Sequence, residues 1–309
     1  MSLTARISPI ETGPSDPEDL FGSALAVIFP DDVMVHHGDA TTALLYTSPH
    51  LPSPLRIKLA DPLDDGERRL FGHYLWNASL LLAEFIEAGT LGLPDDGGLQ
   101  TRVGLPMTAF DVKGKKTIEL GAGTALPSIM AALLGAQEVL VTDYPSDLLL
   151  ATLRRNVTAN TCAAAGSALP SPAPSCVTTP PRAISVHGHE WGRLDAPPAT
   201  THAHAFDVVF AADCLWMPWQ HDNLRRSIAH FLRQDDDARA WVVAGFHTGR
   251  ERMAAFFDEQ ALGAVGLSVE RLWERDCDGV EMPWGEGAAG SEVSGRKRWL
   301  VVGVLKRLG

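Results

Sequence analysis

Short apolar runs alternate with amphipathic stretches along most of the chain. In several of the runs, such as Phe206–Ala211, almost every position is apolar, which is typical of strands that are buried on both faces of a parallel sheet. We predict seven strands, at Lys116–Leu120, Val139–Thr142, Ala183–Val186, Phe206–Ala211, Ala240–Gly245, Ser268–Trp273 and Trp299–Leu305.

The stretches between these runs repeat apolar residues at intervals of three, four and seven, which indicates helices. A first helix is expected over about 67–88, with Gly89 as its stop, and others near 125–135, 146–159, 220–233 and 250–261. Repeated alternation of strand and helix predicts an α/β fold with a mostly parallel seven-stranded sheet and helices on both faces. Only a loop, 275–297, separates the last two strands, so we expect them to form an antiparallel hairpin at one edge.

The remaining segments divide the chain into a main domain over 66–309 and an N-terminal extension over 1–65. The extension is irregular, but Leu25–Phe29 is expected to form a short strand and Leu55–Leu59 to pair as a hairpin strand. Two segments rich in Ala, Pro, Ser and Thr are predicted to be disordered surface insertions, 161–182 and 193–204.

Composition narrows the class of protein. The net charge is −12, which argues against a nucleic-acid binder, because such proteins need basic surface to displace counterions from phosphates. No secretory signal or membrane-spanning run is evident, and the four cysteines form no C-x-x-C pair, so a cytoplasmic location is expected. Histidine pairs such as His36-His37 lack the carboxylate or cysteine partners of a metal site, so no metal is expected.

A glycine-rich turn follows the first strand of the main domain. Gly121-Ala122-Gly123 comes directly after Leu120, and a helix start at Pro127 offers free backbone N–H groups behind it. A dinucleotide fingerprint would need glycine or alanine at Leu126, and Glu119 would repel a phosphate. A carboxylate suits a cationic ligand that carries an ammonium and a sulfonium group.

Three strand ends carry further candidates for the site. Asp143 ends the second strand about 20 residues after the glycines, where an acid accepts the hydroxyls of a ribose. Trp191 follows the third strand and either stacks on an adenine or packs as a surface residue. Asp213 and Trp216 follow the fourth strand and either line the pocket mouth or, for Asp213, cap a helix.

These motifs, in this order, resemble the family-16 class I methyltransferases. The resemblance is carried by Gly72–Ala78, Glu119–Thr124, Thr142–Pro145, Glu190–Gly192, Ala211–Trp216 and Gly245–Arg250. It implies a Rossmann-like methyltransferase fold and S-adenosyl-L-methionine as cofactor. Within the family, the chain is similar to fungal members that methylate the N-terminal amine and adjoining lysine of translation elongation factor 1-alpha. The resemblance therefore implies that elongation factor 1-alpha is the protein substrate. It also implies that the enzyme is a monomer.

The resemblance also implies individual roles. The cofactor would be contacted by Trp76, Glu119, Gly121, Ala122, Gly123, Asp143, Trp191 and Ala212. Asp213 and Trp216 would match the family's acid-x-x-aromatic substrate motif and serve as catalytic residues, with Trp216 where the family usually has Tyr or Phe. Ala125 stands at the third glycine of the turn, a change expected to allow close packing still.

Two other functions stay open at this stage. A small-molecule N-methyltransferase, with nicotinamide or another amine as acceptor, needs the same residues apart from those that contact a protein. A cofactor-binding scaffold without catalysis is less consistent with the intact Gly121, Gly123, Asp143 and Asp213.

Overall fold

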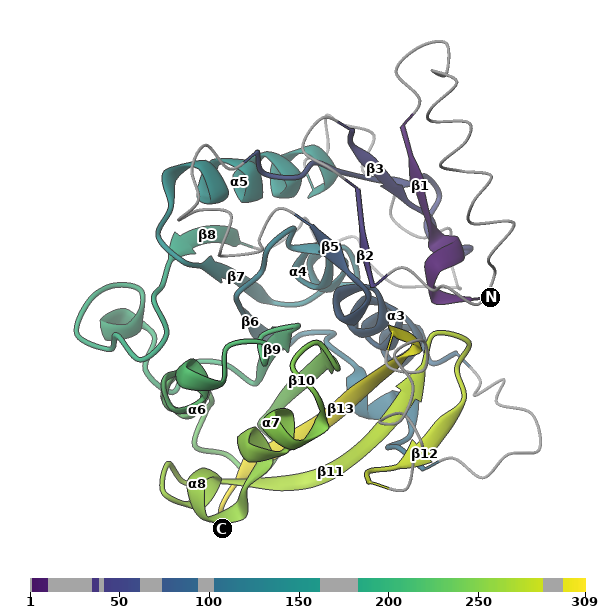
Figure 1. Cartoon of the computed structure of the whole chain (residues 1–309). Coiled ribbons are helices and arrows are strands. Elements are labelled where there is room, and N and C mark those ends of the chain that lie inside the picture. Colours follow the sequence, from purple (N-terminus) through teal and green to yellow (C-terminus); the bar gives the residue numbers. More distant parts are fainter. Residues whose placement is uncertain are drawn as a thin grey trace.

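An eight-stranded sheet forms the centre of the protein (Figure 1). The computed structural model describes residues 2–10, 35–38, 42–61, 74–93, 103–161, 183–285 and 297–309. The strands are β6 (Lys116–Leu120), β7 (Glu138–Asp143), β8 (Ile184–Gly188), β9 (Val208–Ala212), β10 (Arg239–Gly245), β11 (Leu267–Asp276), β12 (Glu281–Pro283) and β13 (Trp299–Arg307). Across the sheet they run in the order β12-β11-β13-β10-β9-β6-β7-β8.

The sheet is parallel from β8 to β10 and antiparallel beyond it. β13 pairs antiparallel with both β10 and β11, so the predicted hairpin of the last two strands is confirmed. The predicted number of seven strands is wrong, because β12 adds an eighth at the edge inside the expected loop 275–297. β12 has only three residues and no apolar alternation, so the sequence carries little signal for it.

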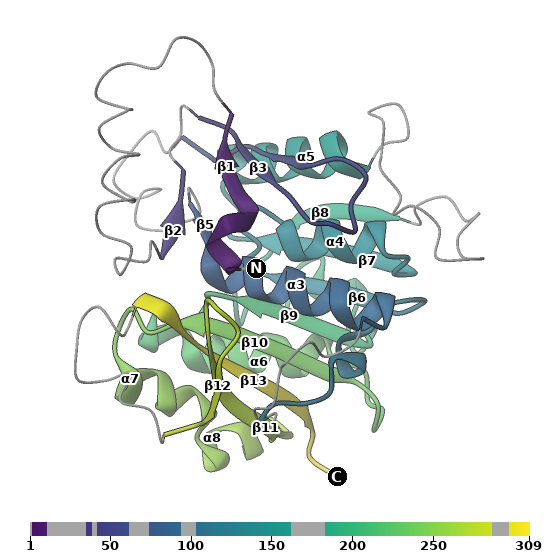
Figure 2. The same cartoon turned by 90° about the vertical axis from the view of Figure 1, so that its right-hand side faces the viewer.

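Helices cover both faces of the sheet (Figures 1 and 2). One face packs against α3 (Asn77–Leu91), α4 (Leu126–Leu133) and α5 (Asp147–Thr161), and the other packs against α6 (His221–Phe231), α7 (Arg250–Ala254) and α8 (Glu259–Gly263). Alternation along β9 explains the two cores: Val208, Phe210 and Ala212 face the first set, and Val209 and Ala211 face the second. The single helix expected over 250–261 is instead two short helices, α7 and α8, with a 3-10 turn between them. The short 3-10 helices are η1 (Leu3–Arg6), η2 (Met107–Phe110), η4 (Ala199–Thr201), η5 (Pro218–Gln220) and η6 (Ala255–Phe257).

Helix α3 begins and ends later than the sequence pattern indicates. Residues 74–76 are extended rather than helical, because β5 (Leu75–Trp76) pairs antiparallel with β2 (His36–His37). The helix continues through the expected stop, Gly89, and ends at Gly92, which adopts the left-handed conformation with φ 61°. A Cβ on Gly89 would lie 2.4 Å from the Met107 carbonyl oxygen, so this glycine permits close packing against η2 instead.

The described part of the N-terminal extension forms a small antiparallel sheet on top of α3 and α5. Its strands are β1 (Ile7–Pro9), β3 (Leu44–Tyr46) and β4 (Leu55–Ile57), which confirms the hairpin strand expected near Leu55. Asn156 of α5 joins it to the main domain, since its side chain exchanges two 2.8 Å hydrogen bonds with the backbone of Lys58. The strand expected at Leu25–Phe29 lies outside the described residues.

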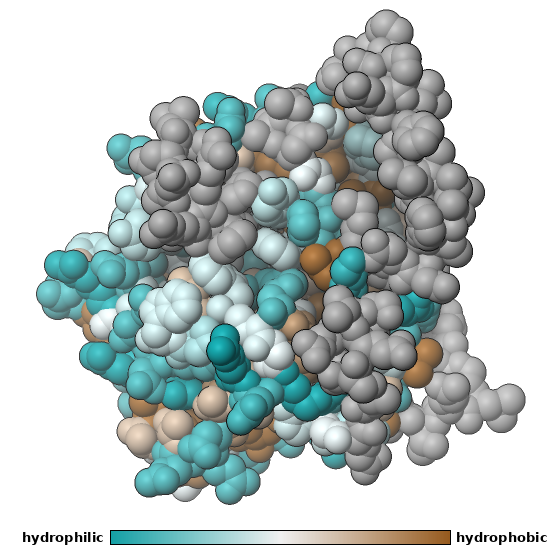
Figure 3. All heavy atoms as spheres, viewed as in Figure 1, coloured by the Kyte–Doolittle hydropathy of each residue, from teal (hydrophilic) through white to brown (hydrophobic). Residues whose placement is uncertain are grey.

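The two Ala/Pro-rich segments have different outcomes. Residues 162–182 lie outside the described part of the chain, but 193–204 are folded, so the expectation of disorder there is wrong. Ala199 is fully buried in the core beneath α6, and its carbonyl oxygen lies 2.9 Å from His230 Nε2. A buried alanine and capped turns hold this loop in place despite its composition. Among the described ranges no helix is long and apolar enough to cross a membrane, and the face seen in Figure 3 is largely hydrophilic.

Candidate active site

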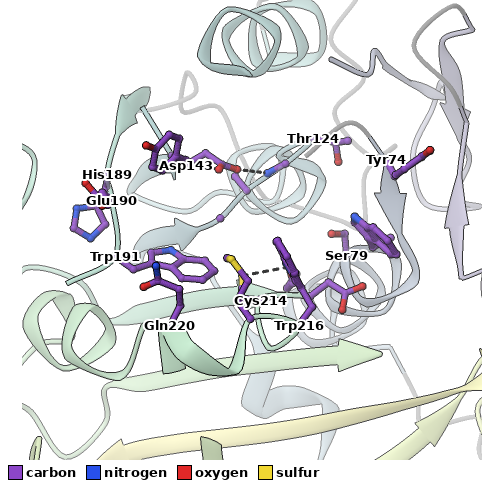
Figure 4. Close-up of a pocket in the computed structure, with 18 residues that line it drawn as sticks. Tyr74, Ser79, Thr124, Asp143, His189, Glu190, Trp191, Cys214, Trp216 and Gln220 are labelled. Atoms are coloured by element: carbon purple, nitrogen blue, oxygen red, sulfur yellow. Dashed lines mark hydrogen bonds between the residues drawn. The ribbon is translucent and has the colours of Figure 1, made fainter. Parts of the chain in front are cut away.

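A pocket lies at the carboxyl ends of the parallel strands, where α/β proteins bind ligands (Figure 4). Its volume, including the open mouth, is about 870 Å³. The lining residues come from the start of α3, the turns after β6, β7 and β8, and the segment after β9. They are Tyr74, Trp76, Ser79, Gly121, Ala122, Gly123, Thr124, Asp143, Tyr144, His189, Glu190, Trp191, Ala212, Asp213, Cys214, Trp216, Met217 and Gln220.

The turn after β6 forms the floor of the pocket and needs its glycines. Gly121 and Gly123 have φ values of 67° and 54°, in the left-handed region that side chains disfavour. A Cβ on Gly121 would lie 2.9 Å from both the Trp191 ring and Cys214 Sγ, so space also demands glycine there. A Cβ on Gly123 would meet nothing within 4 Å, so its surroundings leave room for a ligand beside the backbone.

Ala125 follows this turn and occupies the third glycine position of the motif. It is fully buried and has φ 64°, a left-handed conformation that costs a residue with a Cβ roughly 1–2 kcal/mol. The close packing expected for Ala125 is therefore present, but the backbone there is strained.

Asp143 ends β7 and faces the pocket beside the glycine turn. Its Oδ2 accepts the Gly123 N–H at 2.7 Å and its Oδ1 accepts the Tyr144 N–H at 2.6 Å. Burial raises the pKa of Asp143 to about 6, although the two backbone hydrogen bonds act in the opposite direction. Each carboxylate oxygen keeps a lone pair, which suits the two hydroxyls of a ribose.

Glu119, expected to contact a cationic ligand, does not line the pocket. It is fully buried behind the turn, and its Oε2 accepts the Ser128 N–H at 3.1 Å and the Ser128 hydroxyl at 2.5 Å. Burial raises the pKa of Glu119 to about 8, so the carboxyl group favours its neutral form at pH 7. Its contacts are those of a residue that fixes the start of α4 against the turn.

Trp191 closes one side of the pocket over Gly121, opposite Ser79 and Tyr74 (Figure 4). The loop that carries it is fixed by Ser227 of α6, whose hydroxyl accepts the Gly192 N–H at 2.8 Å. The same hydroxyl lies 3.0 Å from His189 Nε2. Burial lowers the pKa of His189 to about 4, so this ring is neutral.

Asp213 follows directly after β9 and also lines the pocket. It is 7% exposed and has φ 58°, a left-handed conformation that is uncommon for a residue with a side chain. Its Oδ1 accepts the Gly245 N–H at 3.1 Å, and His247 Nε2 lies 3.0 Å from each carboxylate oxygen. The alternative role of Asp213 as a helix cap is not observed, since the cap residue of α6 is Gln220 and that of η5 is Met217.

Three aromatic rings, Tyr74, Trp76 and Trp216, line the same pocket as Asp213. Trp76 packs edge-on against His247 with a centroid distance of 4.9 Å, and Tyr74 lies 5.9 Å from Trp76. Trp216 lines the pocket after Asp213 and meets Trp219 at 6.5 Å. Trp219 itself is 72% exposed, so an aromatic surface continues outward from the pocket mouth.

The structure brings together all the site residues predicted from the sequence except Glu119. It adds His247, which the sequence analysis included only within Gly245–Arg250, one of the segments that carry the family resemblance. The signal was present, because His247 follows β10 as Asp213 follows β9, and neighbouring parallel strands end at the same edge. Ser79 also lines the pocket and had no recognisable pattern, and Thr124 lines it as the last residue of the glycine-turn motif. No cluster of metal-ligating side chains occurs among the described residues.

The residues present fit S-adenosyl-L-methionine, the cofactor that the family resemblance implies. Asp143 has acceptor capacity for ribose hydroxyls, and Trp191 provides an aromatic wall for an adenine. Thr124 Oγ1 is buried at the pocket and has no hydrogen-bond partner among the described residues, so a polar group of a ligand can satisfy it.

Comparisons with known proteins agree with this fit. A family model described as lysine methyltransferase matches residues 62–261. The chain is 30% identical over 183 residues to the protein N-terminal and lysine N-methyltransferase efm7 of Emericella nidulans, covering 58% of this chain and 59% of that protein, slightly under two thirds of its length. It is 30% identical over 216 residues to EFM7 of Gibberella zeae, which bears the same description, covering 67% and 69% of the two chains.

A solved structure supports the fold. A putative SAM-dependent methyltransferase from Streptococcus mutans aligns with a TM-score of 0.51 and 13% identity over 94% of this chain and 65% of that chain. The Rossmann-like fold predicted from the sequence is therefore confirmed, and the match to the family model confirms the predicted cofactor. The chain belongs to the lysine methyltransferase family and is an S-adenosylmethionine-dependent protein methyltransferase.

Proposed function

We propose that the protein methylates the N-terminal amine and the adjoining lysine of translation elongation factor 1-alpha. The observation that carries the proposal is the buried carboxylate of Asp213, which lines the same pocket as the glycine turn and the aromatic side chains of Trp76 and Trp216. The printed description of the curated relatives, protein N-terminal and lysine N-methyltransferase, supports the class of acceptor. The identity of the protein acceptor rests on the family resemblance.

The chemistry asks little of the protein beyond positioning. When bound, S-adenosylmethionine supplies a methyl group that its sulfonium already activates. The pocket residues hold a neutral amine in line with the methyl–sulfur bond and exclude water, an advantage of up to roughly 7–11 kcal/mol in favourable cases. An α-amino group has an unperturbed pKa near 8, against about 10.4 for lysine, so it reaches the neutral form more readily.

Asp213 contributes to this step through its charge. Its carboxylate accepts an N–H of the amine and so directs the nitrogen lone pair toward the methyl group. As the carbon–nitrogen bond forms, positive charge develops on the nitrogen, and a buried carboxylate stabilises that charge more than it stabilises the neutral amine. Trp216 packs against the alkyl part of the acceptor, where an aromatic face also attracts a cation.

The exposed aromatic surface at the mouth favours a protein over a small amine. Trp219 and Tyr144 are 72% and 46% exposed, and Tyr144 lines the pocket while Trp219 contacts Trp216. A macromolecular acceptor would cover these rings, whereas a nicotinamide-sized acceptor would leave them in water.

Mass spectrometry of elongation factor 1-alpha, incubated with the protein and isotope-labelled cofactor, tests the proposal. We expect label on the N-terminal amine and the adjoining lysine, and none when the factor carries an acetylated N-terminus and that lysine is changed to arginine. Absence of label at both positions contradicts the proposal. Label on nicotinamide in a parallel reaction would instead support the small-molecule alternative.

A further inference from the structure

Asp213 and His247 form a pair that joins the ends of two neighbouring strands. His247 Nε2 lies 3.0 Å from both oxygens of Asp213, so the ring nitrogen points at the middle of the carboxylate. An ionised carboxylate can only accept, which means that Nε2 carries a hydrogen in both protonation states of the ring. The ring therefore fixes the direction in which Asp213 presents its remaining lone pairs.

The surroundings hold His247 in this position. A Cβ on Gly245 would lie 2.8 Å from His247 Nε2, so only glycine leaves room for the ring at that distance from Asp213. Trp76, which lines the pocket, packs edge-on against the ring with a centroid distance of 4.9 Å. The ring is 23% exposed, so it can exchange its proton with water while the carboxylate beside it stays buried.

We propose that His247 is a positioning residue for methyl transfer, which orients the Asp213 carboxylate and sets the net charge at the amine site. The inference rests on the proposed function, since it gives Asp213 the amine as its ligand. With a neutral imidazole the pair carries one negative charge and stabilises the cation that forms on the amine nitrogen. With an imidazolium the pair has no net charge, and that stabilisation is weakened.

The groups around the pair decide the direction in which the pKa of His247 is shifted. Burial lowers the pKa of His247, but the Asp213 carboxylate outweighs burial, so the pKa lies above its ordinary value. The neighbouring titratable group is His36, beyond Trp76, whose pKa is lowered by burial and by the charge of His247. Arg250 is turned away from the pair, because its guanidinium binds Glu274 and lies over Phe246.

A nuclear magnetic resonance titration tests the pair without any acceptor. The His247 ring signal is identified as the one missing from the His247→Gln protein, and its pKa is measured in the wild type and in Asp213→Asn. We expect the pKa to fall when the carboxylate is removed. An unchanged pKa would contradict the pairing itself, whatever the acceptor of the enzyme proves to be.

Kinetics on an N-terminal peptide of the acceptor test the role. We expect His247→Ala to lower kcat/KM roughly tenfold to a hundredfold, as for the loss of a hydrogen bond to a charged group, with cofactor affinity unchanged. Gly245→Ala should have a similar effect, since its methyl group displaces the ring. His247→Gln keeps a neutral N–H donor and should recover most of the activity at high pH.

The pH profile separates this role from a merely structural one. Below both pKa values, log kcat/KM of the wild type should rise with a slope of about two, from the amine and from His247, whereas His247→Gln should rise with a slope of about one. Equal slopes in the two proteins, or full activity of His247→Ala, would overturn the inference. Lack of methylation by the wild type on any amine peptide would instead overturn the proposed function, while the titration would still report on the pair.

Discussion

The two ends of the pocket differ in which part of the chain forms them, the backbone at one end and side chains at the other. At the end proposed to bind the cofactor the backbone shapes the pocket: left-handed glycines open the turn, and Asp143 is fixed by the N–H groups of Gly123 and Tyr144. At the acceptor end the side chains of Asp213, His247 and Trp76 form the site, and they come from three separate elements.

This difference explains how one fold can serve many acceptors. We expect the turn to hold its ligand as long as its glycines and the strand-end acid are kept. Side chains that meet across β5, β9 and β10 can be exchanged one at a time without disturbing that turn. Binding of the donor and choice of the acceptor should therefore respond to different substitutions, and four experiments test that separation.

The largest effect is expected at Asp213. Asp213→Asn removes the charge that stabilises the developing ammonium, and we expect kcat to fall about a hundredfold, as when one transition-state contact is removed. Titration calorimetry with S-adenosylhomocysteine should give an unchanged affinity. The control is Asp195→Asn, because the Asp195 side chain is 80% exposed and does not line the pocket. Weakened cofactor binding by Asp213→Asn would break the proposed separation.

Asp143→Ala should produce the converse result. It removes the acceptor for ribose hydroxyls and leaves two backbone N–H groups without their partner, so we expect affinity for S-adenosylhomocysteine to fall roughly tenfold to a hundredfold. Because the pKa of Asp143 is about 6, wild-type affinity should also decline as the pH falls below that value. Asp147→Ala, in the exposed first turn of α5, is the matched control. An unchanged affinity would contradict the assignment of Asp143.

Glu119→Gln tests whether the turn binds its ligand without this acid. Cofactor affinity should be unchanged, because Glu119 faces Ser128 and not the pocket. Stability should differ, since the native pKa of about 8 lies above the ordinary 4.5. Between these values the unfolded state has lost a proton that the native state keeps, so the wild type loses stability as the pH rises from about 5 to 8. Denaturant unfolding should give Glu119→Gln an advantage of about 1–2 kcal/mol that grows with pH; a constant difference would argue against a neutral Glu119.

The smallest effect is expected at Ala125. Ala125→Gly removes the Cβ from a left-handed residue, and we expect the protein to be stabilised by about 0.5–1 kcal/mol, since the greater freedom of glycine in the unfolded chain offsets part of the gain. Ala131→Gly, in the interior of α4, should instead destabilise by a similar amount. Thermal unfolding measures both changes. Destabilisation by Ala125→Gly would show that packing around the methyl group outweighs the strain.

The sequence predicted the parallel part of the fold because short strand-like segments there alternate with helical ones. β6 matches its predicted bounds, and the others differ by one to three residues at an end. β12 was missed, and residues 75–76, predicted to be helical, instead form β5 beside β2. These features depend on which strand lies beside which, and local periodicity does not contain that information.

The residues of the candidate site also fall into two groups, those that a local motif predicts and those that depend on the order of the strands. Gly121, Gly123 and Asp143 lie within one strand–turn–helix–strand unit, so a local motif could find them. The pairing of Asp213 with His247 needs the order of β9 and β10, and the space for it depends on Gly245. The position of Glu119 follows from the side of β6 on which its side chain lies, and the motif alone did not distinguish that side from the pocket.

Strand β13 has a consequence for the order of folding. It inserts between β10 and β11, so the sheet stays divided until Trp299–Arg307 has left the ribosome. Until β13 is synthesised, one edge of β10 is unpaired. β11 and β12 likewise lack the strand that connects them to the remainder of the sheet. Such pairing across a long stretch of chain is slow to form and leaves apolar edges open to other chains meanwhile. Chaperones that recognise exposed strands should therefore find their target in this half of the nascent protein.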